Sequence, residues 1–153
     1  MNNGTNPETY NMSVEHNLER FIEVQKINYE TALSEIKRGK KQSHWMWYIF
    51  PQIQGLGFSS TSKLYAIKDL PEAEEYLQHP KLGGRLLNIC NELIKLTSSD
   101  AHAIFGTPDD LKLKSSLTLF SSVHNTNPVF QLLLEKFFHG TKDHKTLQII
   151  GLA

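Results

Sequence analysis

The chain has 153 residues and a mass of 17.5 kDa, the usual size of one domain, and no linker or internal repeat divides it. Sixteen acidic residues balance sixteen basic ones, which argues against nucleic-acid binding through an overall positive charge. The single cysteine, Cys90, excludes an internal disulfide and a multi-cysteine zinc site, and the histidines are scattered. The sequence therefore predicts neither a metal nor a cofactor.

The first fifteen residues are rich in Asn, Thr and Glu and poor in large apolar side chains. We therefore expect a disordered polar tail at 1–15, followed by a single domain at 16–153. The tail lacks the basic and apolar regions of a signal peptide. The longest apolar run, 45–50, is far shorter than the ~20 residues that span a bilayer. These features predict a cytoplasmic protein without a membrane segment.

A helix is the first predicted element, because apolar residues recur at three- and four-residue steps from Leu18 to Ile36. Gln25 falls on the apolar face of this helix, where a buried amide needs a polar partner. Gly39 is placed to end the helix in a left-handed turn.

Later helix starts are marked by a proline in the first turn, where its missing N–H costs nothing. These starts are Asp69-Leu70-Pro71, His79-Pro80, Thr107-Pro108 and Asn127-Pro128. Ser99 or Asp100 is expected to cap a short helix, and Asp143 a last one. No alternating pattern of convincing length predicts a strand. The sequence thus predicts an all-α fold, a single compact domain of about seven or eight short helices, with a small hairpin at 55–62 as the open alternative.

The segment 40–52, KKQSHWMWYIFPQ, differs from ordinary core sequence because residues 45–50 are all bulky and apolar. This run predicts a mostly buried central helix. Ser43 and His44 would lie in its first turn, where free N–H groups and the helix dipole suit an anion. Lys41 would reinforce that site, and Trp45 or Trp47 could stack on a base. The alternative interpretation is a core helix with no ligand, and the two are compatible.

Two other stretches combine glycine or hydroxyl residues with apolar ones. Gly55 and Gly57 precede a hydroxyl cluster, which fits either close approach to a ligand or a tight turn with a Ser or Thr cap. Ser115 and Ser116 fall within a predicted helix, although serine is a mediocre helix former. They indicate either close helix packing or a hydroxyl-lined pocket wall.

Several of these motifs closely resemble the bacterial family catalogued as domain of unknown function 1810. The resemblance covers about 18–149 and rests mainly on Ser43-His44-Trp45-Met46-Trp47, Ile49-Phe50-Pro51-Gln52, Gly55-Leu56-Gly57, Ile104-Phe105-Gly106 and the run from Ser115 to Phe120. It implies a helical fold, and the family name leaves the activity open. A more distant similarity links Ser43 and the stretch Gly106, Asp109 or Asp110, and Lys112 to the YbiA-like (NADAR) proteins. That similarity implies ADP-ribose-type ligands and cleavage of N-glycosidic bonds, although His44 stands where a Glu is expected.

Two classes of function stay open. One is a hydrolase that acts on N-glycosidic bonds of a nucleotide or ADP-ribose-type ligand. In it Asp109 or Asp110 would be the carboxylate near the sugar, and His44 the acid for the leaving base. The other is a non-catalytic ligand-binding or protein-interaction domain. In both, we expect an anionic small molecule as the ligand. The residues expected to bind it are Lys41, Ser43, Trp45, Trp47, Gln52, Gly55, Gly57, Ser62, Tyr65, Arg85, Lys112, Ser115 and Ser116.

Overall fold

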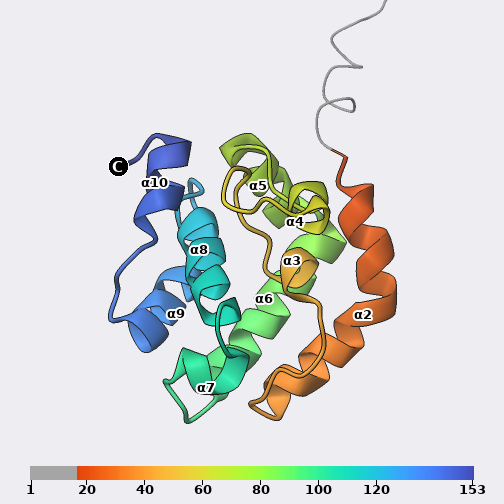
Figure 1. The fold of residues 1–153 in the computed structure, drawn as a ribbon, viewed down its shortest axis with the longest axis vertical. Helices are drawn as coiled ribbons and strands as arrows, with labels where there is room; N and C mark the ends of the chain where they lie inside the picture. Colours follow the sequence, from red (N-terminus) through yellow and green to blue (C-terminus); the bar gives the residue numbers. More distant parts are fainter. Residues whose placement is uncertain (1–16) are drawn as a thin grey trace, which may run out of the picture.

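A computed structural model describes residues 17–153, so the tail predicted at 1–15 lies outside the described residues. The fold within 17–153 is all-helical, as predicted, with nine helices where seven or eight were expected and no strand (Figure 1). In chain order the helices are α2 (Glu19–Lys37), α3 (Met46–Ile49), α4 (Ser60–Leu64), α5 (Leu70–Gln78), α6 (Pro80–Lys95), α7 (Ala101–Phe105), α8 (Asp109–Ser121), α9 (Val129–Phe138) and α10 (His144–Ile150).

Helix α6 runs through the middle of the fold and contacts α2, α5 and α9 (Figure 1). Helix α8 packs against α9, α5, α7 and α10, so it forms the second centre of the core. Aromatic side chains fill much of the space between these helices. The largest fully buried ones are Trp45, Tyr76, Phe21, Phe50, Phe120 and Phe130. No helix of the described part is long and apolar enough to cross a membrane.

The predicted starts of α5, α6, α7 and α10 are confirmed, because their caps are made by the expected residues. At α8 and α9 the predicted proline is instead the N-cap, so Pro108 and Pro128 precede the first turn in which they were expected. Asp69 caps α5 by accepting the Glu72 N–H at 2.9 Å, and Asp143 caps α10 by accepting the Thr146 N–H at 3.0 Å. The His79 imidazole caps α6. Of the two candidates before α7, Asp100 is the cap. Gly39 ends α2 with a φ of +78°, in the left-handed region that favours glycine.

The apolar run at 45–50 is buried as predicted, but the helix expected there is much shorter. Helix α3 contains four residues, and Trp45 is already its N-cap. Ser43 and His44 therefore precede the helix, and the prediction that they form its first turn is wrong. At the other end Pro51 disfavours helical geometry in the residue before it. Phe50 accordingly takes φ −123° and ψ 75°.

The stretch after Pro51 forms a tight turn and a capped helix, so the hairpin alternative is excluded. An isolated parallel bridge joins Ile53 to Ile67. The Ser59 hydroxyl caps α4 by accepting the Ser62 N–H at 3.1 Å. A Cβ on Gly57 would lie 2.5 Å from the Cβ of Ser62, so the turn needs glycine at this position.

Gln25 finds the partners that its buried position requires. Its amide Nε2 donates to the Tyr48 carbonyl at 2.7 Å and to the Tyr76 hydroxyl at 3.0 Å. Its Oε1 accepts from Arg85 at 3.3 Å. Helices α2, α3, α5 and α6 are thus joined through one side chain.

A second polar connection is made by Arg20, near the start of α2. Its Nε donates to the Leu64 carbonyl at 2.9 Å, and Nη2 donates to the Ala66 carbonyl at 2.7 Å. Nη1 and Nη2 contact the two carboxylate oxygens of Glu72 at 3.2 and 3.3 Å, and Nη1 also donates to the Asn17 carbonyl. All five guanidinium N–H donors therefore have an acceptor.

Candidate functional site

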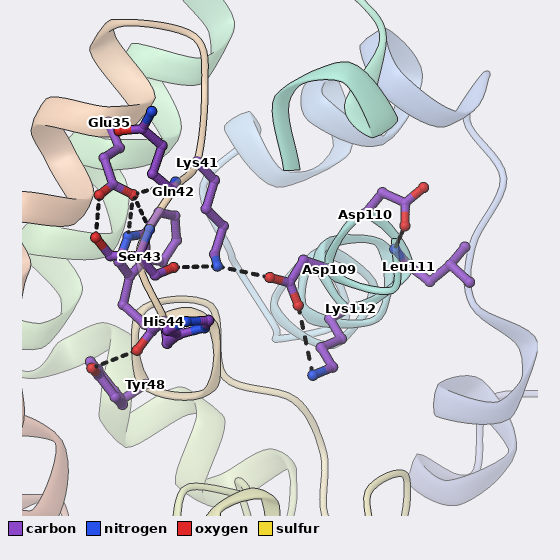
Figure 2. Close-up of polar contacts among 11 residues, drawn as sticks. Glu35, Lys41, Gln42, Ser43, His44, Tyr48, Asp109, Asp110, Leu111 and Lys112 are labelled. Atoms are coloured by element: carbon purple, nitrogen blue, oxygen red, sulfur yellow. Dashed lines mark hydrogen bonds and ion pairs between the residues drawn. The ribbon is translucent and has the colours of Figure 1, made fainter. Parts of the chain in front are cut away.

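The loop that joins α2 to α3 is organised around the carboxylate of Glu35, in the last turns of α2. Its Oε1 accepts the backbone N–H of Gln42 at 2.8 Å, the N–H of Ser43 at 2.9 Å and the indole N–H of Trp45 at 2.9 Å. Its Oε2 accepts the Ser43 hydroxyl at 2.5 Å. Glu35 is 3% exposed, so one buried carboxylate fixes both the backbone and two side chains of this loop (Figure 2).

These bonds keep Glu35 ionised. Burial is the largest single influence and raises the pKa of Glu35, since it disfavours the charged form. The four donors, led by the Ser43 hydroxyl, together outweigh burial because each stabilises the carboxylate. The net result lowers the pKa of Glu35 from 4.5 to about 2.

A second charged cluster lies next to this loop, where α8 begins. Asp109, the first residue of α8, lies between two lysines (Figure 2). Its Oδ2 is 2.8 Å from Lys41 Nζ, and its Oδ1 is 3.7 Å from Lys112 Nζ. Lys41 Nζ also donates to the Ser43 carbonyl at 2.5 Å. The cluster therefore joins the loop before α3 to α8, two segments that are far apart in the sequence.

Each of the two lysines also lies over an indole ring. Lys41 Nζ is 4.8 Å from the ring centroid of Trp45, and Lys112 Nζ is 5.3 Å from that of Trp47. Both distances fall within the range of cation–π attraction. Trp45 is buried, whereas Trp47 is half-buried. The Lys41 side chain is only 7% exposed, so it is largely withdrawn from solvent.

The three residues predicted to be catalytic do not all lie at this cluster. The exposed His44 follows Ser43, and Figure 2 shows its ring on the side where Lys112 and Asp109 lie. Its carbonyl accepts the Tyr48 hydroxyl at 3.1 Å. Asp110 points away from Asp109 (Figure 2). It accepts the Leu111 N–H at 2.8 Å instead.

A small cavity gathers a second group of the predicted ligand residues. Its lining includes Trp47, Gln52, Gly55, Gly57, Ser62 and Tyr65. Its volume is about 30 Å³, whereas ligand pockets usually measure about 300–1,000 Å³. The cavity has room for a water or one small chemical group. Trp47 connects the two groups, since it lines this cavity and carries Lys112 over its ring.

The remaining predicted ligand residues lie outside both groups. Arg85 donates to Gln25 and lies over the ring of Tyr29, 5.8 Å from its centroid. The Ser115 hydroxyl donates to the carbonyl of Leu111 in its own helix at 3.2 Å. Ser116 is 1% exposed, and its hydroxyl is the one buried side-chain polar atom without a partner in the part of the chain that the structure describes. Both serines, which belong to α8, thus lie in the packed interior of the protein.

No sequence pattern singled out Glu35 as part of this site. Glu35 is an acidic residue next to Ile36 of the apolar face, and such a residue is usually expected to face solvent. The available signal was Gly39, because a left-handed turn after α2 returns the chain along its own last turns. That reversal brings Ser43 and Trp45, two donors, to the carboxylate.

The arrangement brings two ammonium groups to one carboxylate, with the imidazole of the exposed His44 on the same side (Figure 2). Ammonium groups bind phosphate and carboxylate anions, and an indole face can take a flat ring by stacking. An imidazole and a carboxylate on one side can transfer protons to and from a bound molecule. The arrangement therefore has the kinds of group that anion binding and acid–base chemistry require.

Comparison with known proteins places the chain among proteins without an assigned activity. It is similar to the conserved hypothetical protein Rv1873 from Mycobacterium tuberculosis, whose crystal structure superposes with a TM-score of 0.86 at 40% sequence identity. The match covers 89% of this chain and 97% of the other. No curated protein matches the chain. Residues 15–150 match the model of the family described as protein of unknown function (DUF1810), and the chain therefore belongs to this family.

Proposed function

We propose that the protein binds a phosphate-bearing small molecule of the nucleotide or ADP-ribose type. The site would be the surface formed by the loop before α3 and the first turn of α8. One observation carries the proposal. Lys41 and Lys112, from distant segments, converge on the two oxygens of one carboxylate, at 2.8 and 3.7 Å.

Two ammonium groups on one side form a local positive site in a chain with no net charge. Lys112 lies 3.7 Å from Asp109, which is too long for a hydrogen bond, so its donors can bind a ligand oxygen. The half-buried Trp47 beside it offers a face for a base. Gln52, Gly57 and Ser62 line the small cavity next to Trp47 and would contact one group at the edge of that ligand.

Hydrolysis of an N-glycosidic bond is the catalytic form of this proposal. Water would attack the sugar carbon C1′ while the bond from C1′ to the base nitrogen breaks. Asp109 would accept the proton of the water, and protonated His44 would donate a proton to the leaving nitrogen. The hydroxyl ends on the sugar, the base leaves with its proton, and the two side chains then exchange one proton through solvent.

Binding without catalysis is the second candidate, and a specific observation favours it. The Asp109 carboxylate is paired with both lysines, and its contact with Lys41 is a short one of 2.8 Å. Both oxygens of this carboxylate therefore already face an ammonium group. In this version neither His44 nor Asp109 transfers a proton, and the two lysines hold the ligand.

Binding is tested by isothermal titration calorimetry with ADP-ribose, AMP and adenosine over a salt series. We expect ADP-ribose and AMP to bind and adenosine to bind more weakly, since it lacks phosphate. Lys112→Ala should weaken both phosphate ligands and flatten the salt dependence. Lys114→Ala is the matched control, because Lys114 lies on the same helix but over Phe138. Equal affinities for Lys112→Ala and wild type would contradict the proposed site.

Catalysis is tested separately, by incubating the protein with AMP or NAD and measuring the released base by chromatography. Release that disappears in His44→Ala and in Asp109→Asn supports hydrolysis. Binding without any release supports the non-catalytic form. Release that persists in both variants would show that neither side chain carries the reaction.

A further inference from the structure

The Asp109 carboxylate occupies the place that the phosphate of a ligand would take. We propose that Asp109 is an internal competitor for the ligand, which holds the two lysines in the empty protein and is displaced when a phosphate group binds. This inference rests on the proposed function, since it concerns the same lysines. It adds that binding of the ligand and release of Asp109 are one event.

The geometry of the contacts supports a competitor. Each carboxylate oxygen of Asp109 faces a different ammonium group, at 2.8 Å from Lys41 and 3.7 Å from Lys112. A phosphate has the same ability to present two oxygens to two donors. Lys41 is 7% exposed, whereas Asp109 is 21% exposed and Lys112 27%. A ligand that approaches from solvent therefore reaches Lys41 by displacing Asp109.

Lys41 has a second partner that would keep it in place after such a displacement. Its Nζ donates to the Ser43 carbonyl at 2.5 Å, and Ser43 is itself held by Glu35 through its N–H and its hydroxyl. The ammonium group thus stays positioned when the carboxylate leaves. Glu35 thus holds the loop in place, whereas Asp109 neutralises the charge of the two lysines.

The Asp109 carboxylate would keep one favourable interaction after its displacement. Asp109 is the first residue of α8, where the helix dipole stabilises a negative charge. Pro108, the N-cap, makes no side-chain cap. The displaced carboxylate therefore loses its lysines without losing its interaction with the helix end. Once displaced, it is also less strongly paired, as the proposed hydrolysis requires of a base.

The test compares Asp109→Asn with Asp110→Asn by titration calorimetry with ADP-ribose and with adenosine at low ionic strength. Both substitutions remove one negative charge from the first turn of α8, but Asp110 makes no contact with either lysine. We expect Asp109→Asn to bind ADP-ribose about tenfold more tightly than the wild type, and Asp110→Asn to bind it within about twofold of the wild type. Adenosine should respond to neither change.

The outcomes separate the inference from the function on which it rests. If the wild type binds ADP-ribose but Asp109→Asn binds no more tightly than Asp110→Asn, the site stands and the competitor is overturned. If no form of the protein binds a phosphate ligand, the proposed function fails and this inference fails with it. Asp109→Ser, which suits a helix start, is measured in parallel. It should also tighten binding, so a folding defect of a single variant cannot decide the result.

Discussion

Replacing Glu35 by glutamine should destabilise the protein while leaving the shape of the loop before α3 intact. The glutamine carbonyl can accept the three N–H donors that now reach Oε1, from Gln42, Ser43 and Trp45. The new amide group faces the Ser43 hydroxyl, which turns from donor to acceptor. The substitution therefore removes a buried charge and retains the number of hydrogen bonds.

The magnitude follows from the pKa of Glu35, which is lowered from 4.5 to about 2. Each pKa unit corresponds to about 1.4 kcal/mol of preference for the charged form, so the ionised carboxylate contributes about 3 kcal/mol to folding. A lowered pKa means that this contribution is complete above the unfolded value and is lost as the pH falls toward the folded value. The stability difference between wild type and Glu35→Gln should therefore be about 3 kcal/mol at pH 7, decline below about pH 4.5 and vanish near pH 2.

Urea unfolding followed by tryptophan fluorescence measures this difference at pH 7, 4 and 3. The exposed Glu74 provides the control, and Glu74→Gln should change stability by less than about 0.5 kcal/mol. A difference at pH 7 below about 1 kcal/mol would refute the reasoning, because it is within the range of an ordinary neutral hydrogen bond. A large difference that does not change with pH would show that packing, not charge, is lost.

Four other substitutions or modifications test the packing by urea unfolding or by labelling. Gly83→Ala should destabilise strongly, because its Cβ would lie 2.0 Å from a backbone oxygen of α5. Gly84→Ala meets nothing within 4 Å and should stabilise by about 0.5–1 kcal/mol. Equal effects of the two would contradict the close approach of α5 and α6. Arg20→Ala should cost about 3–5 kcal/mol, because it leaves the buried Glu72 without its cation. Cys90, whose thiol pKa is raised by burial, should resist alkylation until the protein unfolds.

The sequence predicted the helix ends well because their signals are local. Asp69 and Asp143 cap the helices that follow them, and each is recognised from its own neighbours. The length of α3 was not predicted, because periodicity cannot distinguish a buried helix from a buried irregular segment. Pro51 was the local signal that limits it, since a proline constrains the residue before it.

The charged cluster could be predicted only as a set of residue types. Lys41, Asp109 and Lys112 were each identified, but the pairing of Lys41 with Asp109 arises where α8 lies against the loop before α3, which no local pattern shows. Asp109 and Asp110 were equivalent in sequence. They diverge because one helical step turns their side chains to different sides of α8 (Figure 2).

The distance in sequence between Lys41 and Asp109 has a consequence for the order of folding. Bringing them together closes a long loop, which costs conformational entropy. The ion pair can stabilise the protein only after the loop has closed. We therefore infer that the pair forms after the main folding barrier. Substitutions of Lys41 or Asp109 should then accelerate unfolding and leave the folding rate nearly unchanged. The pair would thus stabilise the folded protein mainly by slowing its unfolding.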